Sequence, residues 1–185
     1  MKTKYNIIYI LSLIALLNLQ NCERDDICAE STITTPRLLI EFYDIESPDD
    51  LKSVPRLTVY GEGLVVEPTE DSDTTIVYNV NVSAAELPLK IEPEAGEERT
   101  TTRFVLEKDT NLRLDTDDTT NSNIDILEIT YLSEEIYVSR ACGYRSIFNE
   151  LEMSFDNDGD TWISSITVDE TQIENENTVH VRIFH

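Results

Sequence analysis

Apolar and polar residues alternate along most of the chain after residue 35, with the period of two that is typical of strands burying one face. The first such segment, "PRLLIEFYDI" at 36–45, puts Leu38, Ile40 and Phe42 on one face. The segment at 123–132 is apolar on both faces and is expected to be a central strand. The pattern predicts further strands at 54–61, 75–82, 87–92, 101–107, 134–142, 149–156, 160–169 and 178–185.

Short polar segments rich in Asp, Glu, Pro and Asn separate these strands and indicate turns. Two short helices are also expected, one at Ser47–Asp50 with a proline at its first position, and one with a two-turn apolar face. The residues of that face are Tyr144, Ile147, Phe148 and Leu151. Many short strands with such turns predict an all-β protein, an antiparallel β-sandwich, with an immunoglobulin-like arrangement as one form of it.

The first 21 residues are predicted to be a cleaved leader rather than part of the fold. Lys2 and Lys4 precede an apolar run at 6–17, and no acidic residue occurs before Glu23. An uncleaved anchor helix is the alternative, but the run is shorter than the roughly 20 apolar residues that a membrane span needs. The predicted organisation is a lipoprotein signal peptide at 1–21, an acidic tether at 22–35 and one β-sandwich domain at 36–185.

Leu19, Gln20 and Asn21 precede Cys22, and this order resembles a bacterial lipobox, although Asn21 stands where a small residue is usual. We therefore predict that Cys22 is the first mature residue and carries acyl chains such as palmitate. Each buried methylene contributes about 0.8 kcal/mol, so two or three chains anchor a protein stably where one binds marginally. The membrane is the expected partner of these chains.

The charge balance excludes two classes of partner. The chain has 14 basic and 37 acidic residues, a formal charge of −23. Loss of residues 1–21 would remove two lysines and no acid, which leaves 12 basic residues against 37 acidic ones, or −25. A surface this acidic repels nucleic acid and anionic lipid headgroups, so neither is expected to bind it directly.

Two cysteines, Cys28 and Cys142, remain once Cys22 is assigned to lipid. An even number of thiols in an oxidising compartment predicts one disulfide bond. Two free buried thiols, or a catalytic or metal-binding thiol, are the alternatives. A catalytic cysteine needs a basic partner, and the two histidines, His180 and His185, both lie in the last six residues.

Five stretches together resemble an uncharacterised family of small Bacteroidetes envelope lipoproteins, a family defined by a domain of unknown function. The stretches are "CERDDIC", "TPRLLIEFYD", "YVSRACGYRSIFNEL", "WISSITV" and "VHVRIFH". The resemblance runs from Cys22 to His185; it implies an envelope lipoprotein, supports pairing Cys28 with Cys142 and implies no activity. The residues directly after Cys22 also resemble a short acidic tag for export to the cell surface, with a solvated spacer as the alternative. The tag comprises Glu23, Arg24, Asp25 and Asp26.

Metal chemistry has weak support in the sequence. Asp156, Asp158 and Asp160 match the first three positions of a calcium loop, but Thr161 and Thr167 stand where glycine and a bidentate glutamate are needed. A hairpin turn at Asp158–Gly159 is the preferred interpretation, and no cofactor is expected. The two histidines are five positions apart, so an extended strand would place them on opposite faces, and structural roles are expected for both.

No catalytic motif is present in the sequence, and Glu134 and Glu135 are adjacent, so on a strand they point to opposite faces. Carboxylates brought together from separate strands leave hydrolysis as a residual alternative. We therefore expect no catalytic residue and a non-catalytic protein-binding or structural module, with an unknown envelope protein as partner. The alternative is a surface lipoprotein that binds a glycan or calcium, suggested by Trp162 beside the aspartates. The expected location is the outer membrane, with the cell surface and the periplasmic face both open.

Overall fold

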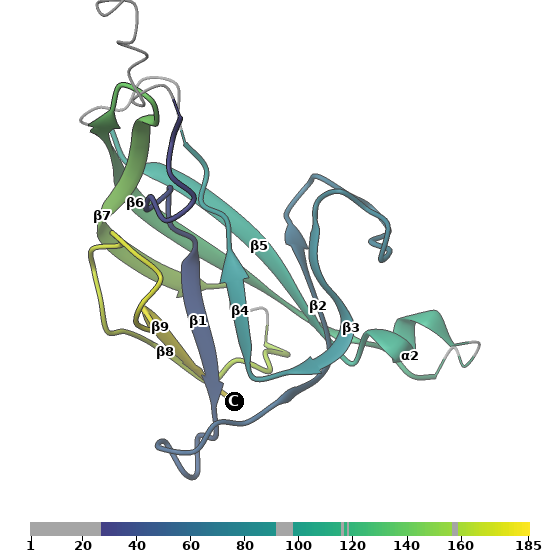
Figure 1. Ribbon diagram of the computed structural model, residues 1–185. Helices are drawn as coiled ribbons and strands as arrows, with labels where there is room; N and C mark the ends of the chain where they lie inside the picture. The colour runs from purple at the N-terminus through teal and green to yellow at the C-terminus, as the bar shows by residue number, and fades with distance from the viewer. Residues whose placement is uncertain (1–26, 92–97, 116, 118, 157–158) are drawn as a thin grey trace, which may run out of the picture. The chain divides into compact units, whose positions relative to one another are not determined.

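The computed structural model of the chain describes residues 27–91, 98–115, 117, 119–156 and 159–185. These residues form nine strands and one short helix (Figure 1). None of the helical structure in these ranges is long and apolar enough to cross a membrane. The elements in chain order are β1 (Leu38–Tyr43), β2 (Val54–Gly61), β3 (Thr75–Val82), β4 (Ala84–Leu87), β5 (Thr100–Lys108), α2 (Thr110–Leu114), β6 (Asn123–Ser139), β7 (Gly143–Phe155), β8 (Ser165–Val168) and β9 (Val181–Phe184).

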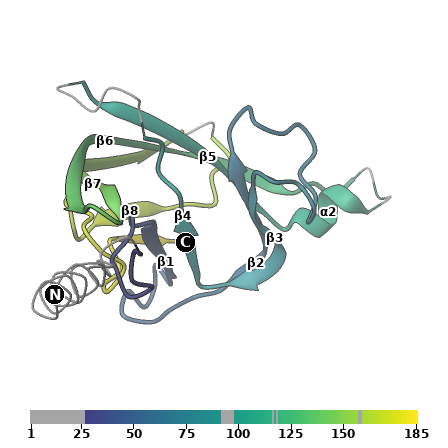
Figure 2. The ribbon, with the colours of Figure 1, turned by 45° about the horizontal axis from the view of Figure 1, so that its top comes forward.

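The strands form two sheets, which confirms the predicted all-β sandwich (Figure 2). The first sheet has the order β4-β1-β9-β8, and the second has the order β3-β2-β5-β6-β7. Antiparallel pairs include β1 with β4, β8 with β9, and β5 with both β2 and β6. One pair departs from the antiparallel expectation: β1 and β9 run parallel, with Ile40 opposite Val181. The first sheet is therefore mixed.

The core lies between the two sheets and follows the alternation seen in the sequence. In β1, Leu38, Ile40 and Phe42 are fully buried, as the pattern predicts. The same rule places alternate residues of β6 inside, and that strand lies between β5 and β7 as a central strand should. The buried residues of β6 include Leu127, Ile129 and Tyr131. Its other face is half-buried, so β6 is less enclosed than its apolar composition predicts.

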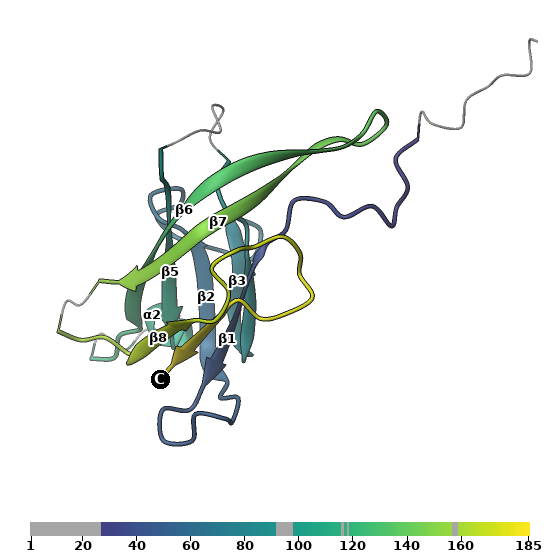
Figure 3. The ribbon, with the colours of Figure 1, turned by 90° about the vertical axis from the view of Figure 1, so that its left-hand side faces the viewer.

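The chain divides into two compact units. The larger, which we call the sandwich unit, comprises residues 33–136 and 145–185. In the smaller, the described residues are 27–32 and 137–144, which we call the hairpin tip because residues 137–144 join β6 to β7. Figure 3 shows β6 and β7 as adjacent strands.

The apolar face predicted to be a helix at 144–151 belongs to β7 instead. Phe148 and Leu151 are both buried although they are three positions apart, a spacing that normally indicates a helix. The cause is Glu150, whose φ of 53° interrupts the regular strand. An extra residue of this kind shifts the alternation by one position and returns Leu151 to the buried face.

The second predicted helix, at Ser47–Asp50, is a turn in which the amide of Asp50 donates to the carbonyl of Ser47. The helix that does form, α2, lies where the sequence indicated a turn. Its Arg113 donates from Nε to the buried carboxylate of Glu107 at 2.7 Å. A buried carboxylate is costly without such a partner, so this ion pair stabilises Glu107 and holds α2 beside β5.

Four predicted strands differ from the structure. The segments at 123–132 and 134–142 join into the single strand β6. The strand predicted at 87–92 does not form over the described residues 88–91: β4 ends at Leu87, because Pro88 has no amide hydrogen to continue a ladder. The segment at 160–169 contributes only β8, and the chain from β7 to β8 crosses from one sheet to the other, so the hairpin predicted at this point is wrong.

Candidate functional site

A pocket of about 700 Å³ opens on the sandwich unit beside β5. Its walls come from three places: the end of β2 with the loop that follows, the segment 88–90 after β4, and the first half of β5. The lining residues are Gly61, Glu62, Leu64, Asp73, Thr74, Ile76, Pro88, Leu89, Lys90, Thr101, Thr102, Arg103 and Phe104. A volume of this size lies in the range of small-molecule sites and of clefts that accept a few side chains.

Apolar side chains form one wall of the pocket. Leu89 and Phe104 are buried at its base, while Leu64 is 67% exposed at its mouth. A Cβ atom on Gly61 would lie 2.5 Å from Cδ1 of Leu64, closer than side chains tolerate. Glycine at this position therefore leaves the room in which Leu64 lies against the end of β2.

Arg103 lines the other side of the pocket and is surrounded by carboxylates. Its Nε atom donates to Glu62 at 2.5 Å, its Nη1 to Glu128 at 2.5 Å and its Nη2 to Asp156 at 2.7 Å. These hydrogen bonds, of which the one to Glu62 has the largest effect, raise the pKa of Arg103 above its usual value. The Arg103 guanidinium thus joins the β2–β3 loop, β6 and the end of β7. The net charge of the cluster is negative because three carboxylates surround one cation.

The segment 88–90 is held in place by Tyr131 and Thr102. The backbone amide of Lys90 donates to Oγ1 of Thr102 at 3.2 Å, and the Tyr131 hydroxyl donates to the carbonyl of Lys90 at 2.7 Å. The two hydroxyls lie 2.6 Å apart. These hydrogen bonds take the place of the β-ladder that Pro88 ends, so residues 88–90 are held in place although they form no strand.

Of the predicted site residues, two form a disulfide. The sulfur atoms of Cys28 and Cys142 lie 2.00 Å apart, and their Cα atoms 4.8 Å apart. This is the pairing that the resemblance supports, and both residues belong to the hairpin tip. Cys22 and the predicted export tag, Glu23 to Asp26, lie outside the described residues.

The calcium candidates do not come together as a site in the described part of the chain. Asp156 is bonded to Arg103, and Asp158 lies outside the described residues. Asp160 follows in the crossing to β8. Within residues 27–91, 98–115, 117, 119–156 and 159–185, no three His, Cys, Asp or Glu side chains are arranged to hold a metal ion.

Trp162 is buried in the core rather than displayed beside those aspartates. Its Nε1 donates to the carbonyl of Leu106 at 3.3 Å, and its ring packs against Phe42 and His185. The backbone amides of residues 162 and 163 both donate to the buried carboxylate of Asp125, at 3.0 and 2.7 Å. This indole cannot stack on a sugar, so the observation that suggested a glycan site does not hold.

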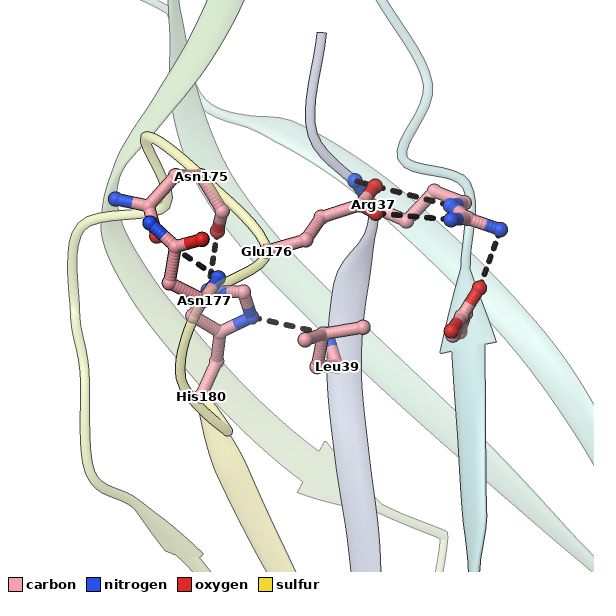
Figure 4. Close-up of polar contacts among 7 residues, drawn as sticks. Arg37, Leu39, Asn175, Glu176, Asn177 and His180 are labelled. Carbon is pink, nitrogen blue, oxygen red and sulfur yellow. Dashed lines mark hydrogen bonds and ion pairs between the residues drawn. The ribbon is translucent and has the colours of Figure 1, made fainter. Parts of the chain in front are cut away.

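Both histidines have structural roles. His180 is buried, its Nδ1 accepts a hydrogen bond from the Leu39 amide at 2.9 Å, and its Nε2 lies 3.0 Å from the Asn175 carbonyl (Figure 4). Nδ1 must be unprotonated to accept, so the ring is neutral with its proton on Nε2. Burial lowers the pKa of both His180 and His185.

An ion pair lies close to His180 along the same loop. The carboxylate of Glu176 accepts from the Arg37 backbone amide at 2.7 Å, from its Nε at 2.9 Å and from its Nη2 at 2.8 Å (Figure 4). Arg37 also pairs with Glu86. The loop between β8 and β9 is thereby fastened to the start of β1.

Sequence reasoning did not identify the pocket or the Arg103 cluster. The alternation at 101–107 places Arg103 and Phe104 on opposite faces of β5. This alternation is the sequence feature that could have indicated a polar role for Arg103. Its three carboxylate partners lie 41, 25 and 53 residues away along the chain. Only the register between strands brings them together.

A family model matches residues 56–185 of the chain, and its family is described as a family of unknown function (DUF6452). No curated protein and no solved structure matches. The matched range takes in the pocket, the Arg103 cluster and the loop from β8 to β9. It begins later than the resemblance drawn from Cys22, and the immunoglobulin-like arrangement stays a prediction.

Proposed function

The chain belongs to this family of unknown function, and we propose that it is a lipid-anchored, non-catalytic binding module of a bacterial cell envelope. Its partner is an envelope protein that inserts apolar side chains into the pocket beside β5. The observation that carries the proposal is the pocket itself: buried Leu89 and Phe104 at its base, with Leu64 exposed at its mouth. An apolar cleft with an exposed leucine at the rim suits a protein segment.

The proposed location rests on the leader and on Cys22. The short apolar run, the lipobox-like order and the resemblance to Bacteroidetes lipoproteins support acylation at the outer membrane. A disulfide between Cys28 and Cys142 suits an oxidising compartment beyond the inner membrane. If Glu23 to Asp26 act as an export tag, the module faces the cell exterior; if they are a spacer, it faces the periplasm.

The absence of catalysis is part of the proposal, and the surroundings of the reactive residues support it. His180 and His185 are each bonded to backbone groups, and Cys28 and Cys142 are joined. Arg103, which lines the pocket together with Lys90, has its donors directed at three carboxylates. These groups therefore support the fold and leave apolar contact as the main chemistry of the pocket.

Site-specific photo-crosslinking in intact cells tests the proposal. A photoreactive phenylalanine analogue in place of Leu64 should give a discrete protein adduct. The same analogue in place of Leu114, which is 48% exposed on α2 and lies outside the pocket, should not. Thr74→Trp, which fills the pocket from the loop before β3, should remove the adduct and leave the melting temperature unchanged. An adduct that survives Thr74→Trp, or equal adducts at both positions, would contradict binding in the pocket.

A further inference from the structure

The hairpin tip exposes an aromatic pair. Tyr137 at the end of β6 and Tyr144 at the start of β7 are 58% and 66% exposed. Their rings meet edge to face, with centroids 5.4 Å apart. Ile27, on the segment that the disulfide joins to this hairpin, is 84% exposed. We call these three exposed side chains the patch, because exposed apolar surface of this kind marks interaction sites.

This patch also lies in a part of the chain that carries little negative charge. Residues 136–149 hold two arginines and no acidic residue, the longest acid-free stretch after Cys22. Among the described residues of the hairpin tip, the charged side chains are Glu30 and Arg140, which cancel. The full chain has a formal charge of −23, so the neutrality of the tip is a local property.

The disulfide sets the distance between this patch and Cys22. Cys28 is six positions after Cys22, and an extended chain advances at most about 3.6 Å per residue, so the two lie within about 22 Å. The Cα atoms of Cys28 and Cys142 are 4.8 Å apart. An anchor on Cys22 therefore keeps the hairpin tip near the bilayer whatever the tether does in between.

We infer that the hairpin tip is a membrane contact in which Tyr137, Tyr144 and Ile27 lie in the interfacial layer of the leaflet that holds the acyl chains. Tyrosine suits this layer because its ring is apolar and its hydroxyl remains hydrated. A neutral tip can approach a lipid surface that repels an acidic domain. The inference rests on the proposed acylation of Cys22 and adds to it the side of the protein that faces the membrane.

Quenching by brominated lipids tests this contact. The acylated full-length protein carrying Tyr144→Trp is reconstituted into vesicles of brominated phosphatidylcholine, and its emission is compared with unbrominated vesicles. The parent protein supplies the background from Trp162, which is buried. Leu114→Trp is the matched control, because Leu114 is also exposed but belongs to α2. We expect about twofold more quenching for Tyr144→Trp than for Leu114→Trp, with Tyr137→Trp as a second probe of the tip.

The mass of the purified protein shows whether its acyl chains are present, and so distinguishes a failed tip contact from a missing anchor. An acylated protein whose tip probes are quenched no more than Leu114→Trp overturns the membrane contact and leaves the anchor intact; a patch that binds a protein instead would give this result. A protein whose mass shows no acyl chains, and which does not enter the vesicles, overturns the anchor and the contact together.

Discussion

The Nδ1 atom of His180 accepts a hydrogen bond from the backbone amide of Leu39 at 2.9 Å, across 141 residues of sequence. The other ring nitrogen donates to Asn175 within the loop from β8 to β9, which is the large yellow loop in Figure 3. One neutral imidazole thus holds the loop to β1. Protonation of Nδ1 would remove its acceptor and leave the Leu39 amide facing a cation.

We predict that the protein loses stability as the pH falls below about 6.5, the ordinary pKa of histidine. Burial lowers the pKa of His180 and His185 in the folded protein, although Glu170 and Glu176 near His180 act in the opposite direction. The unfolded chain therefore binds more protons in the window between the two pKa values, and the free energy of unfolding rises with pH there. Urea unfolding at a series of pH values measures this slope.

His180→Phe identifies the source of that slope. The change leaves the Leu39 amide without its acceptor, which should cost about 1–3 kcal/mol at neutral pH. It should also flatten the pH dependence, and His185→Phe should do so separately. A slope that both variants retain in full would place the pH dependence elsewhere.

Glu176→Gln should destabilise the protein by about 1 kcal/mol, because the carboxylate accepts three hydrogen bonds from Arg37 at a partly exposed site. These bonds lower the pKa of Glu176 to about 2. The stability that Glu176 contributes is therefore fully present above the usual glutamate pKa and is lost as the pH falls toward 2. Glu86→Gln, which removes the more exposed second partner of Arg37, is the control and should cost less. Equal losses in thermal melts of the two variants would show that the extra bonds of Glu176 contribute nothing.

The disulfide should contribute about 2–5 kcal/mol, since it closes a loop of 114 residues in the unfolded chain. Cys28→Ser, Cys142→Ser and the double variant should lose similar amounts, because each removes the same crosslink. Denaturant unfolding under oxidising conditions measures the three losses. Losses that add in the double variant would mean that the two side chains act independently.

Cys22→Ala should abolish incorporation of labelled fatty acid and release the protein from the membrane fraction. The matched control is Cys28→Ser, which removes a neighbouring thiol that belongs to the disulfide and should keep the label. Label retained by Cys22→Ala would disprove the lipobox assignment.

Calcium should leave the melting temperature unchanged, because Asp156 is bonded to Arg103 and Trp162 is buried. A ligand that binds the folded state alone raises stability with its concentration. Thermal melts in millimolar calcium, with magnesium as the control, measure this. A rise specific to calcium would revive the calcium-binding alternative.

The sequence predicted those parts of the fold that depend on local pattern. The alternation of Leu38, Ile40 and Phe42 identified β1 and its buried face, and the same rule found most other strands. Glu150 shows where the rule fails, because a single residue with positive φ changes the apparent period of β7 from two to three. Periodicity alone cannot separate such an irregular strand from a short helix.

The candidate site depends on strand register, which a single sequence does not contain. Arg103 lies opposite Glu128 in the pairing of β5 with β6, but nothing near either residue in the sequence indicates that pairing. The position of Trp162 has the same explanation. Its acidic neighbours suggested a surface site, whereas the crossing from β7 to β8 carries it into the core.

The parallel pair of β1 and β9 has a consequence for the timing of folding. Strand β9 lies between β1 and β8, so the first sheet cannot close until residues 181–184 have been synthesised. Until then β1 has β4 as its neighbour in this sheet and keeps one open edge, which is a template for wrong pairing. Contacts as distant as Ile40 with Val181 also slow folding. A chain of this topology therefore keeps an open strand edge until its last strand is in place, and we expect truncation before Val181 to cause aggregation.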